Sequence, residues 1–364
     1  MKKFLCLVLS IISLTLCACQ SDTNIAAVYD EPGRIPTHVC RLDPSSADDT
    51  RLALLLRKYD ESASVVAVSD GPGGEMTAVY SLPDSVMTYE ITANEGLIAF
   101  YELTTYSDGS VNYALKVIDT NNNNKVHSPY KKTVTDENDI QTRFIAVYDG
   151  CVYYLTKSNL LGRCRVMKYS VKDKELTEYL GFDFTENEMT AGSSCTFISE
   201  KSGYLTCGVV DGNRTVLKTY DLKTNELVRE KQLPYGATLV YMADHDYAAG
   251  TYAMYYISAQ GDERVAVFSY EDADVTDLLK MDENTYVNRE EVRLENGKVY
   301  FEIQDTSKES PYDQFTGMAA DTVSKIIEEY EGCIRLFLNK DAAYILCFDK
   351  KSGSEKMILK KSVG

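Results

Sequence analysis

A strand–turn–strand unit that returns several times along the chain constrains its fold more than any other feature. In residues 215–228, β-branched and aromatic residues flank a polar turn at residues 221–225, as expected for two strands joined by a tight turn. Similar units occupy residues 166–176 and 114–120. Aligning the strand that ends each unit makes six residues equivalent, with separations of 38, 51, 51, 48 and 80: Tyr80, Ile118, Tyr169, Tyr220, Phe268 and Phe348.

A period of about 40 to 50 residues with four short strands in each unit is typical of β-propeller blades. The separation of 80 is then two units of 40. The sequence therefore predicts an all-β protein, a β-propeller of about seven blades of short antiparallel strands over residues 50–364, with six or eight blades as alternatives. The final unit, residues 333–361, offers three strands, and residues 26–42 are predicted to supply its fourth.

One stretch departs from this pattern. Ala319, Val323, Ile326, Ile327 and Tyr330 have the spacing of an apolar stripe on a helix, so residues 319–330 are predicted to form a helix that packs on the ring. A lid or partner-binding helix is the alternative interpretation.

The N-terminal residues have the form of an export signal. Lys2 and Lys3 precede an apolar run that is too short to span a bilayer. Residues 16–19, Leu-Cys-Ala-Cys, resemble the lipobox of bacterial lipoproteins. That resemblance implies cleavage after residue 18 and a lipid on Cys19, whose acyl chains would anchor the protein on the extracytoplasmic face of the cell membrane. An ordinary secretory signal is the alternative. Residues 19–49 are then the lipidated cysteine, a tether and the closing strand.

Charge excludes several partners. The formal net charge is −17, from 38 Lys and Arg against 55 Asp and Glu. Removing Lys2 and Lys3 with the leader makes it 36 − 55 = −19. Such a surface repels phosphate backbones and anionic headgroups, so we expect no nucleic-acid partner and no electrostatic membrane docking.

Seven cysteines lie beyond the leader and lipobox, and none forms a Cys-x-x-Cys motif. Two pairs fall on consecutive strands of predicted hairpins, Cys195 with Cys207 and Cys333 with Cys347, and directly opposed residues of such strands lie close enough for a disulfide. The other interpretation is that these are buried thiols that pack as small hydrophobes.

Motifs for chemistry are few. Asp244, His245 and Asp246 could hold a metal, but a polar strand end explains them better. Residues 119–124 imitate the start of a calcium loop and lack its glycine and its glutamate, so an ordinary turn is expected. No nucleophile elbow or phosphate-binding loop is present. We therefore assign no catalytic, cofactor-binding or metal-binding residue.

Together, the leader and the repeats resemble the β-propeller lipoproteins that bacteria display. The absence of tryptophan argues against a quinone cofactor, and no cofactor is expected. The resemblance implies a non-enzymatic surface protein that binds a protein, peptide or glycan. The alternatives are an extracellular glycan hydrolase or lyase and a ligand sensor for a membrane complex. Carboxylates paired at the mouth of the central channel would favour the enzyme, and a tyrosine-lined face would favour binding.

Overall fold

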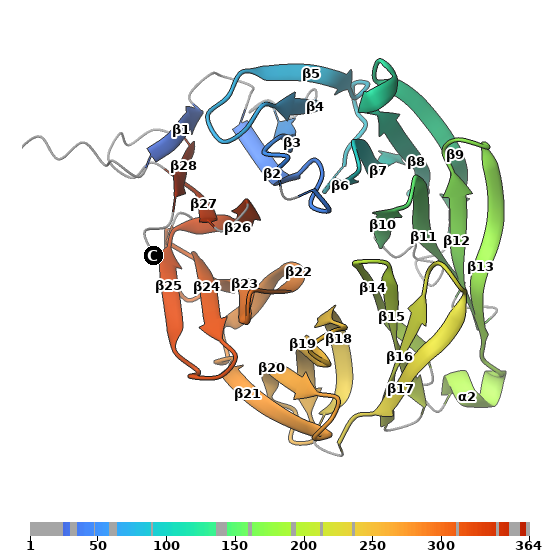
Figure 1. Ribbon diagram of the computed structural model, residues 1–364, viewed down its shortest axis with the longest axis vertical. Helices are drawn as coiled ribbons and strands as arrows, with labels where there is room; N and C mark the ends of the chain where they lie inside the picture. The colour runs from blue at the N-terminus through green and yellow to red at the C-terminus, as the bar shows by residue number, and fades with distance from the viewer. Residues whose placement is uncertain are drawn as a thin grey trace, which may run out of the picture.

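The computed structural model describes residues 25–29, 35–46, 48–57, 64–88, 90–135, 144–158, 162–190, 194–211, 214–234, 237–310, 313–339, 342–348 and 357–361. Within these residues the chain forms seven antiparallel sheets of four strands each. Figure 1 shows the sheets arranged around a common axis, and the strands nearest to it are β2, β6, β10, β14, β18, β22 and β26. The prediction of an all-β propeller of about seven blades is therefore confirmed.

The first three blades follow one another along the chain. Blade 1 comprises β2 (Ile35–Arg41), β3 (Leu52–Arg57), β4 (Ser64–Ser69) and β5 (Met76–Ser81). Blade 2 comprises β6 (Thr92–Asn94), β7 (Leu97–Thr105), β8 (Val111–Asp119) and β9 (Lys125–Val134). Blade 3 comprises β10 (Ile145–Tyr148), β11 (Cys151–Ser158), β12 (Arg163–Ser170) and β13 (Glu175–Asp183).

The next three blades repeat this order. Blade 4 comprises β14 (Ser194–Lys201), β15 (Tyr204–Asp211), β16 (Arg214–Asp221) and β17 (Glu226–Gln232). Blade 5 comprises β18 (Ala237–Asp246), β19 (Thr251–Ser258), β20 (Glu263–Ser269) and β21 (Asp274–Lys280). Blade 6 comprises β22 (Thr285–Glu295), β23 (Lys298–Asp305), β24 (Phe315–Asp321) and β25 (Ile327–Glu331). A 3₁₀ turn, η1 (Thr120–Asn122), and a short helix, α2 (Glu186–Thr190), lie between strands.

Blade 7 joins the two ends of the chain. It comprises β26 (Cys333–Asn339), β27 (Ala342–Phe348), β28 (Met357–Lys361) and, as its outermost strand, β1 (Ile25–Tyr29). Ile25 pairs with Lys360 and Tyr29 pairs with Met357. The predicted closing strand is thus confirmed for β1. Residues 35–41 were assigned wrongly, because they form β2, the innermost strand of blade 1, and the propeller begins before Thr50.

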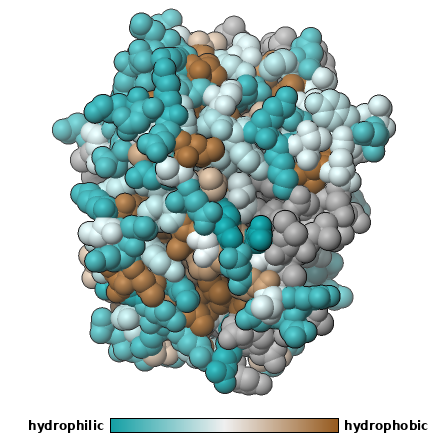
Figure 2. Space-filling model, turned by 90° about the vertical axis from the view of Figure 1, so that its right-hand side faces the viewer, coloured by the Kyte–Doolittle hydropathy of each residue, from teal (hydrophilic) through white to brown (hydrophobic). Residues whose placement is uncertain are grey.

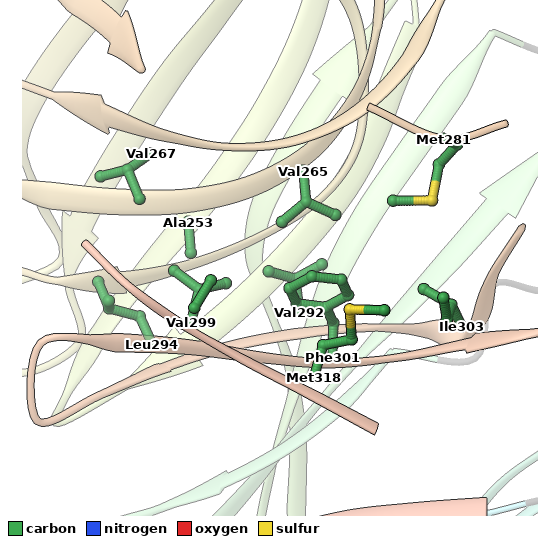
Figure 3. Packing of buried hydrophobic residues seen from close by; sticks show 11 residues of the cluster. Ala253, Val265, Val267, Met281, Val292, Leu294, Val299, Phe301, Ile303 and Met318 are labelled. Carbon is green, nitrogen blue, oxygen red and sulfur yellow. The ribbon is translucent and has the colours of Figure 1, made fainter. Parts of the chain in front are cut away.

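The core lies between the blades. Seven clusters of buried hydrophobic residues are described, and each joins two neighbouring blades. Figure 3 shows the cluster between blades 5 and 6, in which Val265 of β20 and Phe301 of β23 meet across the junction. Because a blade is covered on both faces, its second strand is buried almost throughout, as in β7 and β23.

The outermost strands face water. Figure 2 shows the side of the ring that lies on the right in Figure 1, where hydrophilic residues cover most of the surface and hydrophobic residues form separate patches. Half-exposed Val126 on β9 and Leu176 on β13 are such isolated residues. Single exposed apolar side chains of this kind are ordinary and need no partner.

The predicted helix over residues 319–330 is wrong. These residues form the end of β24, a turn and most of β25. In the turn, Asp321 accepts hydrogen bonds from the backbone N–H groups of Val323 (3.0 Å) and Ser324 (2.7 Å). Val323 and Ile326 of the expected stripe are exposed to solvent.

The structure also corrects the alignment of the repeats. Ile118, Tyr169, Tyr220 and Phe268 are equivalent residues near the ends of the third strands of blades 2 to 5. Tyr80 lies in an outermost strand and Phe348 in a second strand. The separation of 80 is therefore not two units, and the equivalent residue of blade 6 is Ala320.

Candidate functional site

The direction of the strands places two sets of turns on one face of the ring. In blades 1 to 6 the four strands follow one another in antiparallel order, so the turns between first and second strands and between third and fourth strands lie at the same end. We call this end the turn face. The connections between second and third strands lie on the opposite face, which we call the far face.

The repeated sequence unit builds the turn face. In five blades, the residue after the third strand donates its backbone N–H to the glycine carbonyl of the inner turn, as in Thr120 to Gly96 (3.0 Å) and Leu222 to Gly203 (2.9 Å). The five pairs join residues 120 and 96, 171 and 150, 222 and 203, 270 and 250, and 322 and 297. This hydrogen bond explains the repeated sequence unit. The Asp or Ser at the end of the third strand holds the outer turn, which joins the third and fourth strands.

Charged residues meet where the inner strands of blades 4, 5 and 6 reach the turn face. Lys201 at the end of β14 places its Nζ 3.1 Å from Oδ2 of Asp244 on β18 and 3.5 Å from Oε1 of Glu295 on β22. The same Asp244 oxygen accepts the backbone N–H of Leu294 at 2.6 Å. The ion pairs and this hydrogen bond therefore tie three consecutive blades together.

Glu95 makes a similar tie between blades 2 and 3. Its Oε1 accepts the N–H of Asp149 at 2.8 Å and its Oε2 accepts the N–H of Gly150 at 2.7 Å. Asn94 adds a bond from its Nδ2 to the carbonyl of Val147 at 2.9 Å. Both Glu95 and Asp244 are thus carboxylates whose oxygens are engaged in holding neighbouring blades.

Glu200 differs from these carboxylates in its electrostatics. Its Oε1 accepts one backbone N–H, from Gly203 at 2.9 Å. The pKa of Glu200 is raised to about 7, mainly by burial; the charges of Asp244 and Glu95 add to the rise, and the hydrogen bond from Gly203 and the charge of Lys201 oppose it. A carboxyl group that changes its charge near neutral pH marks a candidate functional residue.

Aromatic and cationic side chains lie beside this cluster, at the junction of blades 4 and 5. The rings of Tyr204 and Tyr247 stack with centroids 3.7 Å apart and an interplanar angle of 12°. The guanidinium carbon of Arg229 lies 4.0 Å from the centroid of Tyr247 and 4.9 Å from that of Tyr270. Because Tyr204 already covers one face of Tyr247, Arg229 must lie over the other. We call these four residues the tyrosine–arginine stack.

Lys201, Glu200 and the two stacked tyrosines were not singled out from the sequence. The signal that could have found them is their position: Glu200, Lys201 and Tyr204 flank the inner-turn glycine Gly203, and Asp244 and Tyr247 come just before the corresponding glycine of blade 5. Polar or aromatic residues at that place in a blade lie at the turn face, where they contact the neighbouring blade.

The three candidate metal ligands do not converge. His245 is buried, with 1% of its surface exposed, and its ring stacks on Tyr252 at 6.0 Å, whereas Asp244 joins the inter-blade ties and Asp246 accepts the N–H of Ala249. Residues 119–124 form an ordinary turn in which Asp119 accepts the N–H of Asn121. Over the described parts of the chain, no group of His, Cys, Asp and Glu side chains could hold a metal ion.

The two predicted cysteine pairs differ in register. Cys333 and Cys347 are directly opposed on β26 and β27, and a disulfide between them stays a prediction. Cys195 is opposite Val209 and Cys207 is opposite Ile198, because the strands turn at Ser202 and Gly203, between the paired Lys201 and Tyr204. Cys207 is a thiol, and its burial raises its pKa well above the ordinary value. The sequence argument for opposition therefore fails for that pair.

Cys19 and the leader lie outside the described residues, as does residue 47 in the expected tether. No helix within the described ranges is long and apolar enough to cross a membrane.

Comparisons with known proteins support the fold alone. No family model matches the chain, and no curated protein matches its sequence. The hydrazine synthase of Kuenenia stuttgartiensis has a TM-score of 0.54 at 11% identity, over 92% of this chain and 97% of that chain. A chain of the mitotic checkpoint complex has a TM-score of 0.53 at 12% identity, over 94% and 93%. A prolyl endopeptidase structure has a TM-score of 0.52 at 11% identity, over 86% of this chain and 49% of that chain.

Proposed function

We propose that this protein is a non-enzymatic binding propeller, held on the extracytoplasmic face of the cell membrane by a lipid on Cys19. Its ligand site is the turn face over blades 4 and 5, from Glu200, Asp244 and Lys201 at the ends of the inner strands outward to the tyrosine–arginine stack. The ligand is a peptide or protein segment that presents a basic side chain to Glu200. The leader motif supports the anchor, and the arrangement of carboxylates and tyrosines supports the binding site.

The observation that carries this proposal is the environment of Glu200. Burial and the charges of Asp244 and Glu95 disfavour its ionised form more than the Gly203 hydrogen bond and Lys201 favour it, so a further cation placed beside it would relieve the repulsion and gain a charge-assisted hydrogen bond. Partly exposed Tyr204 offers aromatic surface to the rest of a ligand, and Tyr247, which is covered on both faces, supports it. Asp244 and Glu95 already accept backbone N–H bonds, which suits a rigid binding surface better than a catalytic pair.

A glycan hydrolase or lyase is the second candidate. The pKa of Glu200, about 7 because of its burial, is suitable for a general acid. A ligand sensor for a membrane complex would use the same face and the same anchor. It differs in that it also contacts the membrane complex when the ligand is bound.

The test uses arrays of short peptides containing lysine or arginine, matched peptides with acetyl-lysine or citrulline, and neutral oligosaccharides. We expect the full chain to retain the basic peptides, and to retain them more strongly as the pH rises through about 7 because Glu200 then ionises. Glu200→Gln should lose this retention. Glu271→Gln, which alters an exposed carboxylate in the outer turn of blade 5, should keep it.

Two outcomes would contradict the proposal. Cleavage of oligosaccharides that is lost in Glu200→Gln would establish the enzyme. Equal retention of charged and neutralised peptides would show that Glu200 does not recognise a basic side chain. The anchor is tested separately: Cys19→Ser should move the protein from the membrane to the medium, and unchanged membrane retention would refute the lipid assignment.

A further inference from the structure

The turn between β24 and β25 holds two apolar side chains out in solvent. Val323 is 89% exposed and Ile326 is 65% exposed. The turn is nevertheless well defined by hydrogen bonds, because Asp321 accepts from the N–H groups of Val323 and Ser324 and its carbonyl accepts from Lys325 at 3.0 Å. The two side chains are therefore presented by a fixed scaffold.

The same turn in other blades carries polar side chains at these positions. Blades 3, 4, 5 and 6 share its geometry, with a positive φ of 59°, 59°, 54° and 60° at Lys174, Asn225, Ala273 and Lys325. The residues equivalent to Val323 are Lys172, Lys223 and Glu271, and those equivalent to Ile326 are Glu175, Glu226 and Asp274. The fold thus does not require apolar residues here, and adjacent exposed apolar side chains indicate a contact surface.

The position of this turn identifies what it contacts. In blade 7 the third strand, β28, runs toward the turn face, and β1 is antiparallel to it, so Ile25 begins β1 at the turn face. Blade 6 lies beside blade 7, as Figure 1 shows, and the β24–β25 hairpin is at its outer rim. Cys19 stands six residues before Ile25, and six residues span at most about 20 Å.

We propose that Val323 and Ile326 insert into the lipid bilayer interface beside the acyl chains on Cys19. The propeller then contacts the membrane through the rim formed by blades 6 and 7. Moving two apolar side chains out of water is favourable, and the acyl chains on Cys19 keep them within reach of the headgroup region. Glu200 and the tyrosine–arginine stack belong to blades 4 and 5, outside this rim, and stay in solvent. This inference rests on the lipid anchor of the proposed function.

The natural chain contains no tryptophan, so a single tryptophan reports one position. We would place the lipidated full-length Val323→Trp variant in phosphatidylcholine vesicles whose acyl chains carry bromine. Lys308→Trp is the matched control, because Lys308 is exposed in the same blade on the far face, between β23 and β24. We expect blue-shifted, bromine-quenched emission from the tryptophan at 323 and unquenched emission from that at 308. Adding Ile326→Asp should abolish the quenching at 323.

Unquenched emission at both positions, with the protein still sedimenting with the vesicles, would overturn the insertion and leave the anchor intact. Failure to sediment would instead refute the anchor. A third outcome also overturns the inference: if Val323→Trp combined with Cys19→Ser shows a concentration-dependent blue shift without vesicles, a second copy of the chain covers this turn.

Discussion

At the scale of single residues, His245 shows how a polar side chain can be buried without serving a site. It lies near the end of β18, with 1% of its surface exposed, and neither ring nitrogen has a hydrogen-bond partner among the described residues. Burial lowers the pKa of His245 to about 4, against the opposing effect of Asp244. Lys201 and Arg229 lower it further and Asp246 opposes them. The neutral ring is thus strongly favoured in the folded protein.

His245 should therefore make the protein sensitive to acid. Between pH 6.5 and about 4 the unfolded chain binds more protons at this residue, so the free energy of unfolding falls as the pH falls through that window. His245→Phe removes this dependence and should gain about 2 kcal/mol relative to the natural protein on going from pH 8 to pH 5. Urea unfolding at the two pH values measures the difference, and parallel changes in both proteins would contradict it.

At the scale of elements, the blades are joined by buried charges as well as by apolar clusters. Glu302 on β23 has no exposed side-chain surface, and its Oε1 lies 2.9 Å from Nη2 of Arg293 and accepts the N–H of Leu336 at 2.7 Å. Arg293 also donates to the carbonyl of Leu336. One carboxylate thus fixes β22 and β23 of blade 6 against β26 of blade 7.

Removing this carboxylate should loosen the junction between blades 6 and 7. Glu302→Ala removes the ion pair with Arg293 and the acceptor for the N–H of Leu336, and we expect a loss of about 3–5 kcal/mol in the free energy of unfolding. Replacing both partners, with Glu302→Leu and Arg293→Met, should cost less than the single change because no uncompensated charge remains. Denaturant unfolding compares the variants, and a larger loss in the double variant would contradict the argument.

The strands and the contacts between blades were only partly predictable from the sequence. Alternating apolar residues and turn signals identified most strands, because those signals are local. The helix expected over residues 319–330 failed because five apolar residues fell at helical spacing by coincidence, while pairing with β23 decided the conformation. The tie through Glu302 joins residues 34 apart on different blades, and nothing in the local sequence of either partner indicates it.

At the scale of the whole molecule, the period of the repeats was enough to predict about seven blades. It could not predict where the candidate site lies. Separations of 51, 51 and 48 between blades 2 and 5 were enough to count units of four strands. Which residues meet at the axial end depends on the order of strands within each blade. Glu95 and Glu200 are 105 residues apart in sequence, and only the closed ring brings their charges within influence of each other.

Closure of that ring depends on the first strand of the chain. β1 supplies the outermost strand of blade 7 through four residue pairs with β28, and a cluster that includes Leu346 and Leu54 packs blade 7 against blade 1. Deleting residues 20–29 would leave the edge of β28 unpaired while keeping β2 in blade 1. We expect a loss of about 2–4 kcal/mol from the missing backbone hydrogen bonds and a lower melting temperature for the whole domain.

The matched control deletes residues 20–24 alone, which precede β1, and should leave the melting temperature unchanged. If β1 closes the ring, the longer deletion must destabilise every blade together, because each blade is held by its two neighbours and a weakened blade 7 loosens both blade 6 and blade 1. A single cooperative transition at lower temperature would show this coupling. An unchanged melt after the longer deletion would mean that three strands suffice for blade 7, and that the apolar junction between blades 7 and 1 closes the ring without β1.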